Sequence, residues 1–406
     1  MVDNTKEDIL YIVHRIPYPP NKGDKIRSFN ILKYLSQHYR VHLATFIDDP
    51  KDRQFVDSLD EYSCDKLVVS IDPLSRKLLS LAGLLTGEAL SNRFYRNRQM
   101  QSWVSDKVLN QGVTRVVLFS SPMAQFVSSL TDSIDALVMD FVDVDSEKWF
   151  QYAEKHAFPM SYLYRREGRA LRAFEARVSD SCRASVFVSN SEAELFKQKA
   201  PVRYPDKVIA ISNGVDTDSF NPKNVYDSPF KGGEKAVVFT GAMDYWANID
   251  AVKWFCKEVW PRVRSRDSNA VFYIVGSKPV EDVLALEKID GVKVTGFVQE
   301  VQPYLAHCHV CVAPLRIARG IQNKVLEALS MSKVVVATPE ALEGIVGYQT
   351  ESPVATMCSD PDNYAQALLH HLSNPEPEVY EPARSYVEAH FSWESHLSQL
   401  DSLLES

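Results

Sequence analysis

The chain contains the stretch PLRIARGIQNKVLEAL at residues 314–329. A short apolar strand, Val310 to Ala313, leads into it, and apolar residues adopt helical spacing from near Ile321 onward. An α/β protein builds an anion pocket in this way at the carboxyl end of a parallel strand, because backbone N–H groups and the helix dipole both point at the loop. The stretch therefore predicts an α/β fold in which this loop binds an anion.

The charged residues of this stretch suggest the kind of anion. Arg316, Arg319 and Lys324 flank Gly320 and carry enough positive charge for a diphosphate. The carboxylate of Glu327, farther along the predicted helix, can accept hydrogen bonds from the paired hydroxyls of a ribose. A nucleotide diphosphate is therefore the ligand that these residues predict.

Length and composition set the outer bounds. At 406 residues, the chain exceeds the size at which one hydrophobic core usually stops growing, so we expect two domains of similar size. The net charge of −8 argues against a general nucleic-acid binder. No apolar run approaches the roughly 18 residues of a membrane span, and no apolar signal segment follows the polar N-terminus. We therefore expect a cytoplasmic protein.

Apolar runs of strand length alternate with helical patterns along the chain. Ile9–Val13 is typical of a parallel strand that is covered on both faces. A stretch rich in Pro, Gly and Lys that extends to Glu234 is typical of a linker, and the alternation resumes at Ala236–Phe239. This pattern predicts two parallel, doubly wound sheets.

Two strand-to-helix turns contain a glycine. Gly23 and Asp24 lie between the first strand and the next helical pattern, which makes them a second candidate site for an anion or a sugar. The alternative is a plain turn in which Asp24 caps the helix. Gly241 follows the strand Ala236–Phe239, where a glycine permits close approach of the backbone to a ligand.

Acidic residues follow the predicted strand 136–141. Asp143 and Asp145 come directly after it, at a strand end where carboxylates can orient hydroxyl groups. The alternative is that Asp145 or Ser146 caps the next helix. We favour a functional role for at least one of these carboxylates.

Residues 76–98 combine a compact apolar group with five flanking arginines and lysines. Such a segment can lie on an anionic membrane surface, although we favour a core helix followed by a solvated basic helix, because the apolar run is short. Cys308 and Cys311 have the spacing of metal ligands, but they flank an apolar strand and no second ligand pair is near in sequence. We therefore predict buried thiols and no metal site.

The ordered motifs of the chain resemble those of family-four glycosyltransferases with the GT-B fold. The motifs are NGVD at 213–216, GAM at 241–243, Gly276, GF at 296–297 and KVLEA at 324–328. More narrowly, PPNKGDKIR at 19–27 and DVDS at 143–146 resemble the sugar transferases associated with exosortase (PEP-CTERM) and exopolysaccharide gene systems.

This resemblance implies two Rossmann-like domains that face each other across a cleft, with the nucleotide-sugar donor held mainly by the second. We expect the first domain at residues 1–205, completed by C-terminal helices at about 385–406, and the second at 206–384. The implied reaction retains the anomeric configuration and needs neither a metal nor a cofactor, since the nucleotide sugar is a co-substrate. Glu327 matches the glutamate that holds the ribose hydroxyls in the family.

Two regions depart from the family pattern. Arg319 stands where the family usually has a second glutamate, and Met243, Asp244 and Asn248 occupy a loop that often carries an arginine and a lysine. The two departures have one physical interpretation: the cations of the diphosphate site have moved to Arg316, Arg319 and Lys324.

The resemblance and the residues together predict the roles of the site. Arg319, Lys324 and, more weakly, Arg316 would stabilise the departing diphosphate, and Glu327 would bind the ribose. Lining positions near the phosphates and sugar are predicted for Gly320, Gly241, Gly23 and Asp24. Positions beside the acceptor hydroxyl are predicted for His14, Asp143 and Asp145.

The expected partners are a nucleotide-diphosphate sugar, a glycan or polyprenyl-linked acceptor and, peripherally, the inner face of a membrane; no nucleic acid is expected. Two other functions fit the same architecture. A sugar-nucleotide epimerase would alter the sugar without transferring it, and a non-catalytic protein would bind the nucleotide sugar and do no chemistry.

Overall fold

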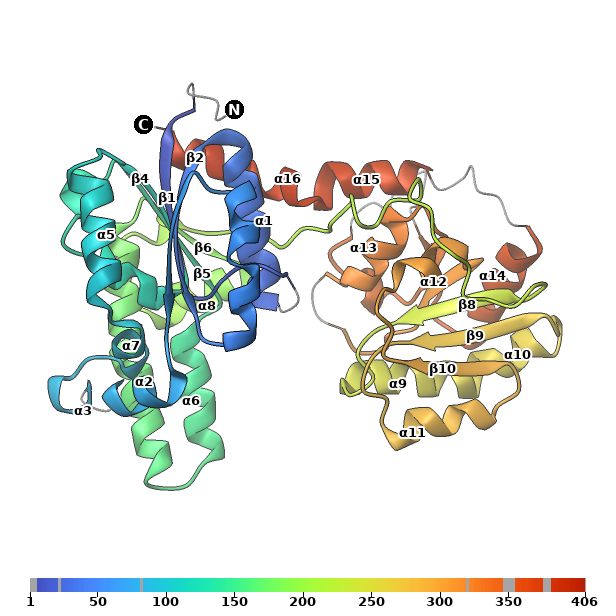
Figure 1. Cartoon of the computed structure of the whole chain (residues 1–406). Coiled ribbons are helices and arrows are strands. Elements are labelled where there is room, and N and C mark those ends of the chain that lie inside the picture. The colour runs from blue at the N-terminus through green and yellow to red at the C-terminus, as the bar shows by residue number, and fades with distance from the viewer. Residues whose placement is uncertain are drawn as a thin grey trace. The chain divides into compact units, whose positions relative to one another are not determined.

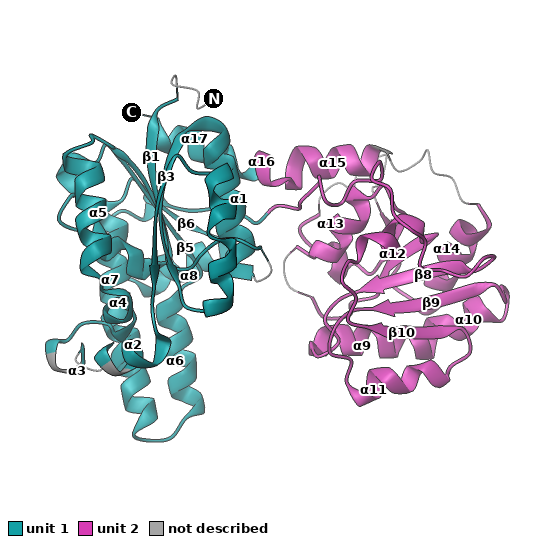
Figure 2. Cartoon of the chain, viewed as in Figure 1, with its two compact units in different colours: residues 1–213, 396–406 teal, residues 214–395 magenta. Residues whose placement is uncertain are grey.

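The computed structural model describes residues 6–20, 23–80, 83–318, 321–345, 355–374 and 381–405. The chain forms two compact units, which Figure 2 shows in different colours. Residues 1–213 and 396–406 make up unit 1, and residues 214–395 make up unit 2. None of the described helices is long and apolar enough to cross a bilayer.

Unit 1 is built on a seven-stranded sheet in which all neighbouring strands are parallel, in the order β3-β2-β1-β4-β5-β6-β7. Its strands are β1 (Asp8–Val13), β2 (Arg40–Ile47), β3 (Asp65–Ser70), β4 (Arg115–Phe119), β5 (Ala136–Val142), β6 (Ala184–Phe187) and β7 (Val208–Ala210). The side chains of residues 9–13 are fully buried, because helices cover both faces of the sheet (Figure 1).

The helices of unit 1 include one from the far end of the chain. They are α1 (Gly23–His38), α2 (Pro73–Ser80), α3 (Gly83–Thr86), α4 (Leu90–Tyr95), α5 (Arg98–Leu109), α6 (Asp145–Lys155), α7 (Met160–Ser181), α8 (Asn190–Lys199) and α17 (Gln399–Leu404). Tyr34 of α1 donates a hydrogen bond to Asp401 at 2.8 Å, and Arg115 Nε donates to the carbonyl of Leu404 at 2.9 Å. The last helix therefore returns to the first unit, as the predicted fold requires.

Unit 2 is built on a six-stranded parallel sheet in the order β10-β9-β8-β11-β12-β13. Its strands are β8 (Lys235–Thr240), β9 (Ala270–Val275), β10 (Val292–Gly296), β11 (Val310–Ala313), β12 (Val335–Ala337) and β13 (Thr356–Met357). Its helices are α9 (Trp246–Trp254), α10 (Trp260–Arg264), α11 (Glu281–Leu284), α12 (Gln302–His307), α13 (Asn323–Ser330), α14 (Pro361–Ser373), α15 (Glu381–Phe391) and α16 (Trp393–Leu397), which runs past the division at residue 395.

The predicted fold class, two parallel doubly wound α/β sheets, is confirmed. In both sheets the strand order reverses beside the first strand, between β1 and β4 in unit 1 and between β8 and β11 in unit 2. Ligands of open α/β sheets bind at the carboxyl ends of the strands that flank such a reversal. The stretch 314–329 follows β11 directly and so lies at the reversal point of unit 2.

Candidate functional site

The candidate site of unit 2 joins the loop after β8 to the start of α13. Lys324 Nζ donates a hydrogen bond to Asn248 Oδ1 at 2.5 Å, and Asn248 Nδ2 donates to the carbonyl of Ala242 at 2.9 Å. Asn248 therefore fixes the lysine against the backbone of the β8–α9 loop. Its placement gives a physical role to a position where the sequence departs from the family pattern.

Gly241 makes this close packing possible. A Cβ atom at Gly241 would lie 2.7 Å from Asn248 Nδ2 and 3.1 Å from Lys324 Nζ. A Cβ atom at Gly276, which follows β9, would lie 1.7 Å from the carbonyl oxygen of Gly241. Gly276 is needed because a side chain there would collide with the backbone of Gly241. A side chain at Gly241 would instead displace the ends of the Asn248 and Lys324 side chains.

Lys324 and Glu327 lie one helical turn apart on α13, so both face the same side. Burial lowers the pKa of Lys324 to about 8, although the charge of Glu327 opposes this shift. Burial raises the pKa of Glu327 to about 7, and the nearby Lys324 charge partly offsets the shift. Lys324 Nζ also lies 4.3 Å from the ring centre of Phe239, a cation–π contact that shields it further from water.

The carboxylate of Glu327 is half-buried, and none of the described residues donates a hydrogen bond to it. A carboxylate in this state is costly unless a donor from outside the protein satisfies it. Paired ligand hydroxyls are donors of the kind that a carboxylate can accept. The pair formed by Lys324 and Glu327 thus offers one cation and one acceptor on the same helix face.

Arg316, which the sequence predicts to bind the diphosphate, instead pairs with an acidic residue of α9. Its Nε lies 3.0 Å from Asp250 Oδ2, a second nitrogen contacts the other carboxylate oxygen, and its guanidinium lies 6.0 Å from the ring centre of Trp254. These residues border a groove of about 650 Å³ on the surface of α9. The predicted Arg319 and Gly320 lie outside the described residues.

Unit 1 has its own group of predicted site residues, which begins directly after β1. His14 Nε2 lies 3.6 Å from Asp24 Oδ2, and Arg15 pairs with both Asp24 (2.8 Å) and Asp48 (2.7 Å). The hydrogen bond from His14, followed by the charge of Arg15, holds the pKa of Asp24 well below its usual range. The His14 ring stacks on Phe119 at 5.7 Å. Asp24 therefore lies in a charged network in the first turn of α1, and the exposed Gly23 opens that turn.

Asp143 and Asp145 lie after β5, where the strand ends in an irregular turn. The β5–β6 register shifts between Asp140 and Val142, and Val142 has a φ of 69°, which is rare for a β-branched residue. Asp143 and Asp145 both pair with Lys148, at 2.8 Å and 2.9 Å. Burial lowers the pKa of Lys148, but the two carboxylates outweigh it, so the net pKa is above the usual value.

Tyr95 of α4 connects these two acidic groups. Burial raises the pKa of its hydroxyl, and the carboxylates of Asp48, Asp24 and Asp145 raise it further, while Arg15 lowers it. The charges after β1 and those after β5 thus act on one phenol at the same edge of the sheet. Tyr95 belongs to a segment with no motif, so sequence patterns did not indicate it.

A buried ion pair lies next to this edge of the sheet. It was not predicted from the sequence. Arg27 is 1% exposed and Asp140 is 4% exposed; Arg27 Nε donates to Asp140 Oδ2 at 2.9 Å and Nη1 donates to Asn213 Oδ1 at 2.9 Å. Burial raises the pKa of Asp140, and the charge of Arg27 opposes the shift. The arginine joins α1, β5 and the end of unit 1, residues too distant in sequence for a pattern to connect.

One group of described residues has the spacing of metal ligands, Asp8, His42 and Cys64. It lies where β1 and β2 begin, at the sheet edge opposite the candidate site. His42 Nε2 is 2.8 Å from Asp8 Oδ1, and Arg40 Nε contacts the same oxygen at 3.1 Å, so an arginine already balances the carboxylate charge. The sulfurs of Cys308 and Cys311 are buried and lie 3.4 Å apart.

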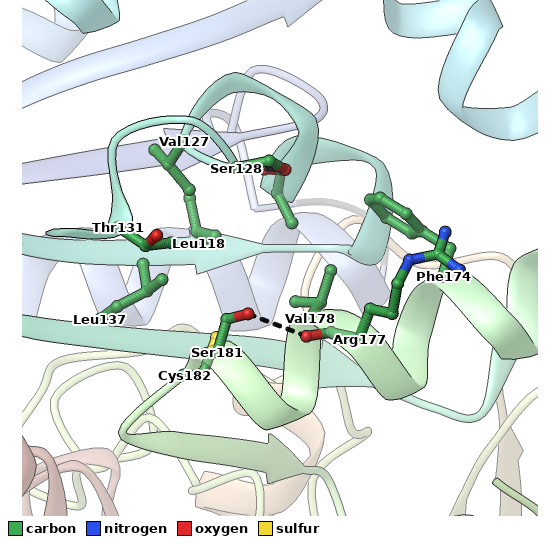
Figure 3. Close-up of a pocket in the computed structure, with 11 residues that line it drawn as sticks. Leu118, Val127, Ser128, Thr131, Leu137, Phe174, Arg177, Val178, Ser181 and Cys182 are labelled. Carbon is green, nitrogen blue, oxygen red and sulfur yellow. Dashed lines mark hydrogen bonds between the residues drawn. The ribbon is translucent and has the colours of Figure 1, made fainter. Parts of the chain in front are cut away.

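An apolar cavity of about 210 Å³ lies between α7 and strands β4 and β5 (Figure 3). Leu118, Leu137 and Val178 line its wall, Arg177 and Ser181 border it, and the Ser181 hydroxyl donates to the Arg177 carbonyl at 3.0 Å. None of the predicted site residues lines this cavity, so it lies apart from the candidate site.

Comparisons with known proteins agree with this geometry. Residues 234–374 match the family model described as Glycosyl transferases group 1, which covers β8, β11 and α13. No curated protein sequence is significantly similar to the chain.

Several solved structures share the fold of the whole chain. A glycosyltransferase from Rickettsia africae is 15% identical, with a TM-score of 0.63 and coverage of 98% of both chains. HepE from Anabaena, in complex with UDP and glucose, is 13% identical, with a TM-score of 0.58 and coverage of 98% of this chain and 99% of that one. WaaG, a glycosyltransferase involved in lipopolysaccharide biosynthesis, is 15% identical, with a TM-score of 0.57 and coverage of 98% and 100%. The group 1 domain and the fold shared with these enzymes identify the chain as a glycosyltransferase with the GT-B fold.

Proposed function

We propose that the protein is a retaining, metal-independent glycosyltransferase that moves a sugar from a nucleotide-diphosphate sugar to a glycan or lipid-linked acceptor. The synthesis of cell-surface polysaccharide or exopolysaccharide is its proposed setting, and contact with the inner face of a membrane accompanies a lipid-linked acceptor. The observation that carries the proposal is the half-buried Lys324 and Glu327 pair beside Gly241, within the group 1 domain.

In the proposed reaction, the bond between the anomeric carbon and the diphosphate oxygen breaks, and a bond to the acceptor oxygen forms on the same face of the sugar. Negative charge develops on the departing diphosphate, where the Lys324 ammonium and the start of α13 stabilise it in place of a metal. The acceptor proton moves to the departing phosphate oxygen. Arg319 has the same stabilising role in the proposal, and Arg316 acts only if a ligand releases it from Asp250.

The nucleotide end of the donor is assigned to Glu327. Its half-buried carboxylate accepts no hydrogen bond from the described residues, so ribose hydroxyls would satisfy acceptor sites that those residues leave open. HepE, which has the same fold, was solved with UDP and glucose, so UDP-glucose is a suitable first probe for the donor.

The acceptor end is assigned to unit 1. His14, Asp143 and Asp145 would orient the acceptor hydroxyl, and Gly23 and Asp24 would line the path of the donor phosphates and sugar. The contacts of Asp24 with His14 and Arg15 support this assignment, because they keep an ionised carboxylate beside an imidazole. Orientation of the hydroxyl is what such a group contributes when the departing phosphate is the base.

A donor panel tests the proposal. We expect one among the UDP-, GDP- and ADP-sugars to raise the thermal midpoint of the wild type, because a ligand that binds only the native state stabilises it. The same shift is expected in Glu300→Ala, whose exposed glutamate serves as a matched control, and not in Glu327→Ala. Equal shifts in both variants would remove Glu327 from the donor site.

Product analysis by NMR separates the proposal from its rivals. A retaining transferase gives a product with the anomeric configuration of the donor, with or without a chelator. An altered donor sugar in the absence of any acceptor would instead identify an epimerase. Donor binding with neither hydrolysis nor transfer would identify a protein that binds nucleotide sugars and does no chemistry.

A further inference from the structure

The helical hairpin formed by α6 and α7 carries an unusual group of exposed apolar side chains. Sixteen large hydrophobic residues are exposed among the residues that the structure describes, and four of them fall within residues 152–162. They are Tyr152 (48% exposed), Phe158 (81%), Met160 (39%) and Tyr162 (66%). We call residues 152–162 the hairpin tip. Figure 1 shows that α6 and α7 extend together beyond the sheet of unit 1.

The hairpin is held rigid behind its tip by rings that face each other across the two helices. Trp149 of α6 lies 5.6 Å from Tyr164 of α7, and His156 lies 5.2 Å from the same ring. Deeper in the hairpin, a Cβ atom at Gly168 would lie 2.8 Å from the Phe150 ring, so the two helices pack tightly there. The exposed side chains of the tip are therefore presented by a preformed support.

Positive charge surrounds the hairpin tip. Lys155, Arg165 and Arg169 are exposed, and none of them has an ion-pair partner among the described residues. Tyr162, Arg165 and Arg169 share one face of α7, because three- and four-residue spacings return to the same side of a helix. The hairpin, residues 145–181, contains seven Lys and Arg and six Asp and Glu, a net charge of +1, whereas the whole chain has a net charge of −8.

We propose that the hairpin tip docks unit 1 on an anionic lipid bilayer. Tyr and Phe side chains at a protruding loop match the interfacial region of a bilayer, and unpaired cations beside them match its phosphate groups. A glycan ligand fits less well, since the tip protrudes and none of the cavities described above is lined by its residues. This inference deepens the proposed function, because it places a lipid-linked acceptor beside unit 1.

The proposed membrane contact lies away from residues 76–98, where the sequence first suggested it. Arg93 and Arg96 of that segment both pair with Glu88, at 2.6 Å and 2.7 Å, so this carboxylate offsets part of their charge. Leu74 and Leu79 of α2 are nevertheless exposed, at 74% and 62%. These leucines are therefore the alternative membrane contact, and their substitution tests α2 against the hairpin tip.

Flotation with vesicles tests the inference without any enzyme assay. The full chain is mixed with vesicles of phosphatidylcholine alone or with about 30% phosphatidylglycerol, and we expect binding only to the anionic vesicles. The double variant Phe158→Ser, Tyr162→Ser should lose roughly tenfold or more in partitioning, because it removes the two most exposed rings of the tip. Lys155→Glu with Arg165→Glu should reduce binding by at least about fivefold per residue.

Matched variants make the outcome specific. Val225→Ser removes an apolar side chain that is 97% exposed in unit 2, and it should float as the wild type does. Leu74→Ser with Leu79→Ser should also float. Loss of flotation in the leucine variant alone would assign the contact to α2 and overturn the inference, as would a wild type that never floats.

Two further measurements distinguish a lipid contact from self-association and from a catalytic defect. Sedimentation should show the same oligomeric state for the wild type and the Phe158, Tyr162 variant; a dimer lost in that variant would assign the tip to a second copy of the chain and overturn the inference. Donor hydrolysis or transfer to a water-soluble acceptor should be unchanged in the tip variants. If no protein shows donor chemistry while flotation follows the tip, the proposed function fails and the membrane contact stands.

Discussion

The two sheets place charged residues at equivalent strand ends, but they balance those charges differently. In unit 1, Arg15 holds Asp24 and Asp48, Lys148 holds Asp143 and Asp145, and the protein supplies a partner for each carboxylate. In unit 2, Lys324 donates a hydrogen bond to the neutral Asn248, and Glu327 accepts no hydrogen bond from the described residues. The difference indicates that these carboxylates of unit 1 are already paired with cations, whereas Glu327 of unit 2 has no hydrogen-bond donor among the described residues.

This contrast has a consequence for how each region responds to change. Removing one member of a paired network leaves its partner uncompensated, so the main cost in unit 1 is to stability. For Lys324 and Glu327, the described residues of unit 2 provide no ion-pair partner in direct contact, so removing either one should mainly affect ligand binding and turnover. The following predictions test that distinction, beginning with the largest expected effect.

The buried pair of unit 1 should give the largest loss of stability. Arg27→Ala leaves the carboxylate of Asp140 buried without its cation, and we expect the free energy of unfolding to fall by about 3–5 kcal/mol. Urea-induced unfolding measures the change. Arg203→Ala, at an exposed arginine of the same unit, should change it little. Similar losses of unfolding free energy in both variants would show that the buried pair contributes no more to stability than an exposed arginine does.

Lys324→Ala should show the opposite pattern in unit 2. We expect turnover to fall about 10²- to 10³-fold, as when one preorganised donor to a departing oxyanion is removed, without a matching loss of stability. Steady-state transfer assays and thermal unfolding of the same preparations measure both effects. Lys288→Ala, at an exposed lysine of the same unit, is the control. A variant of Lys324 that turns over normally would remove the lysine from the reaction.

Glu175 of α7 gives a pH-dependent test within unit 1. Burial raises the pKa of this carboxyl to about 8, while the Ser146 backbone N–H, which donates to it at 3.3 Å, opposes the shift. The unfolded chain loses this proton near pH 4.5, the native protein keeps it to about pH 8, and stability should therefore fall as pH rises between these values. Glu175→Gln should flatten this slope, with a gain on the order of 2 kcal/mol at pH 8. Parallel stability curves for the two proteins would contradict the assignment.

The smallest effect concerns the affinity of unit 2 for a donor diphosphate. Lys324 has a pKa of about 8, so its ammonium is present below that pH and is lost above it. We expect the Kd for UDP or the preferred donor to rise by up to about tenfold per pH unit above pH 8. Titration calorimetry at several pH values measures this, and Lys324→Arg should abolish the dependence because an arginine stays charged.

The sequence predicted the fold well because its evidence is local. Runs such as Ile9–Val13 identify strands covered on both faces, and the signals of residues 310–329 predicted the strand β11 and the helix α13. The anion pocket expected between them stays a prediction. Contacts between residues that lie far apart in sequence could not be predicted from such local patterns. No pattern paired Arg27, the last residue of the motif at 19–27, with the distant Asp140. The turn of Arg316 toward Asp250 also carried no signal, since side-chain direction depends on the neighbour that α9 provides.

The site residues were predicted unevenly for the same reason. Gly241 and Lys324 come together in the structure as their strand-end positions indicate, but Asn248, which links them, was noted only as a departure from the family pattern. Tyr95 and Lys148 were missed because each acquires its role from carboxylates on other elements. The assigned roles of the site residues stay predictions until the variants are measured.

The packing of α17 on unit 1 affects the order in which the two units can complete their folding during synthesis. The ribosome releases residues 1–213 long before residues 396–406, yet Tyr34 and Arg115 contact Asp401 and Leu404. Domains commonly fold in the order of their synthesis, and here that order is interrupted, because the unit made first lacks α17 until residues 399–404 have been made. The nascent unit 1 therefore exposes the apolar surface that Leu400 and Leu404 later cover, throughout the synthesis of unit 2.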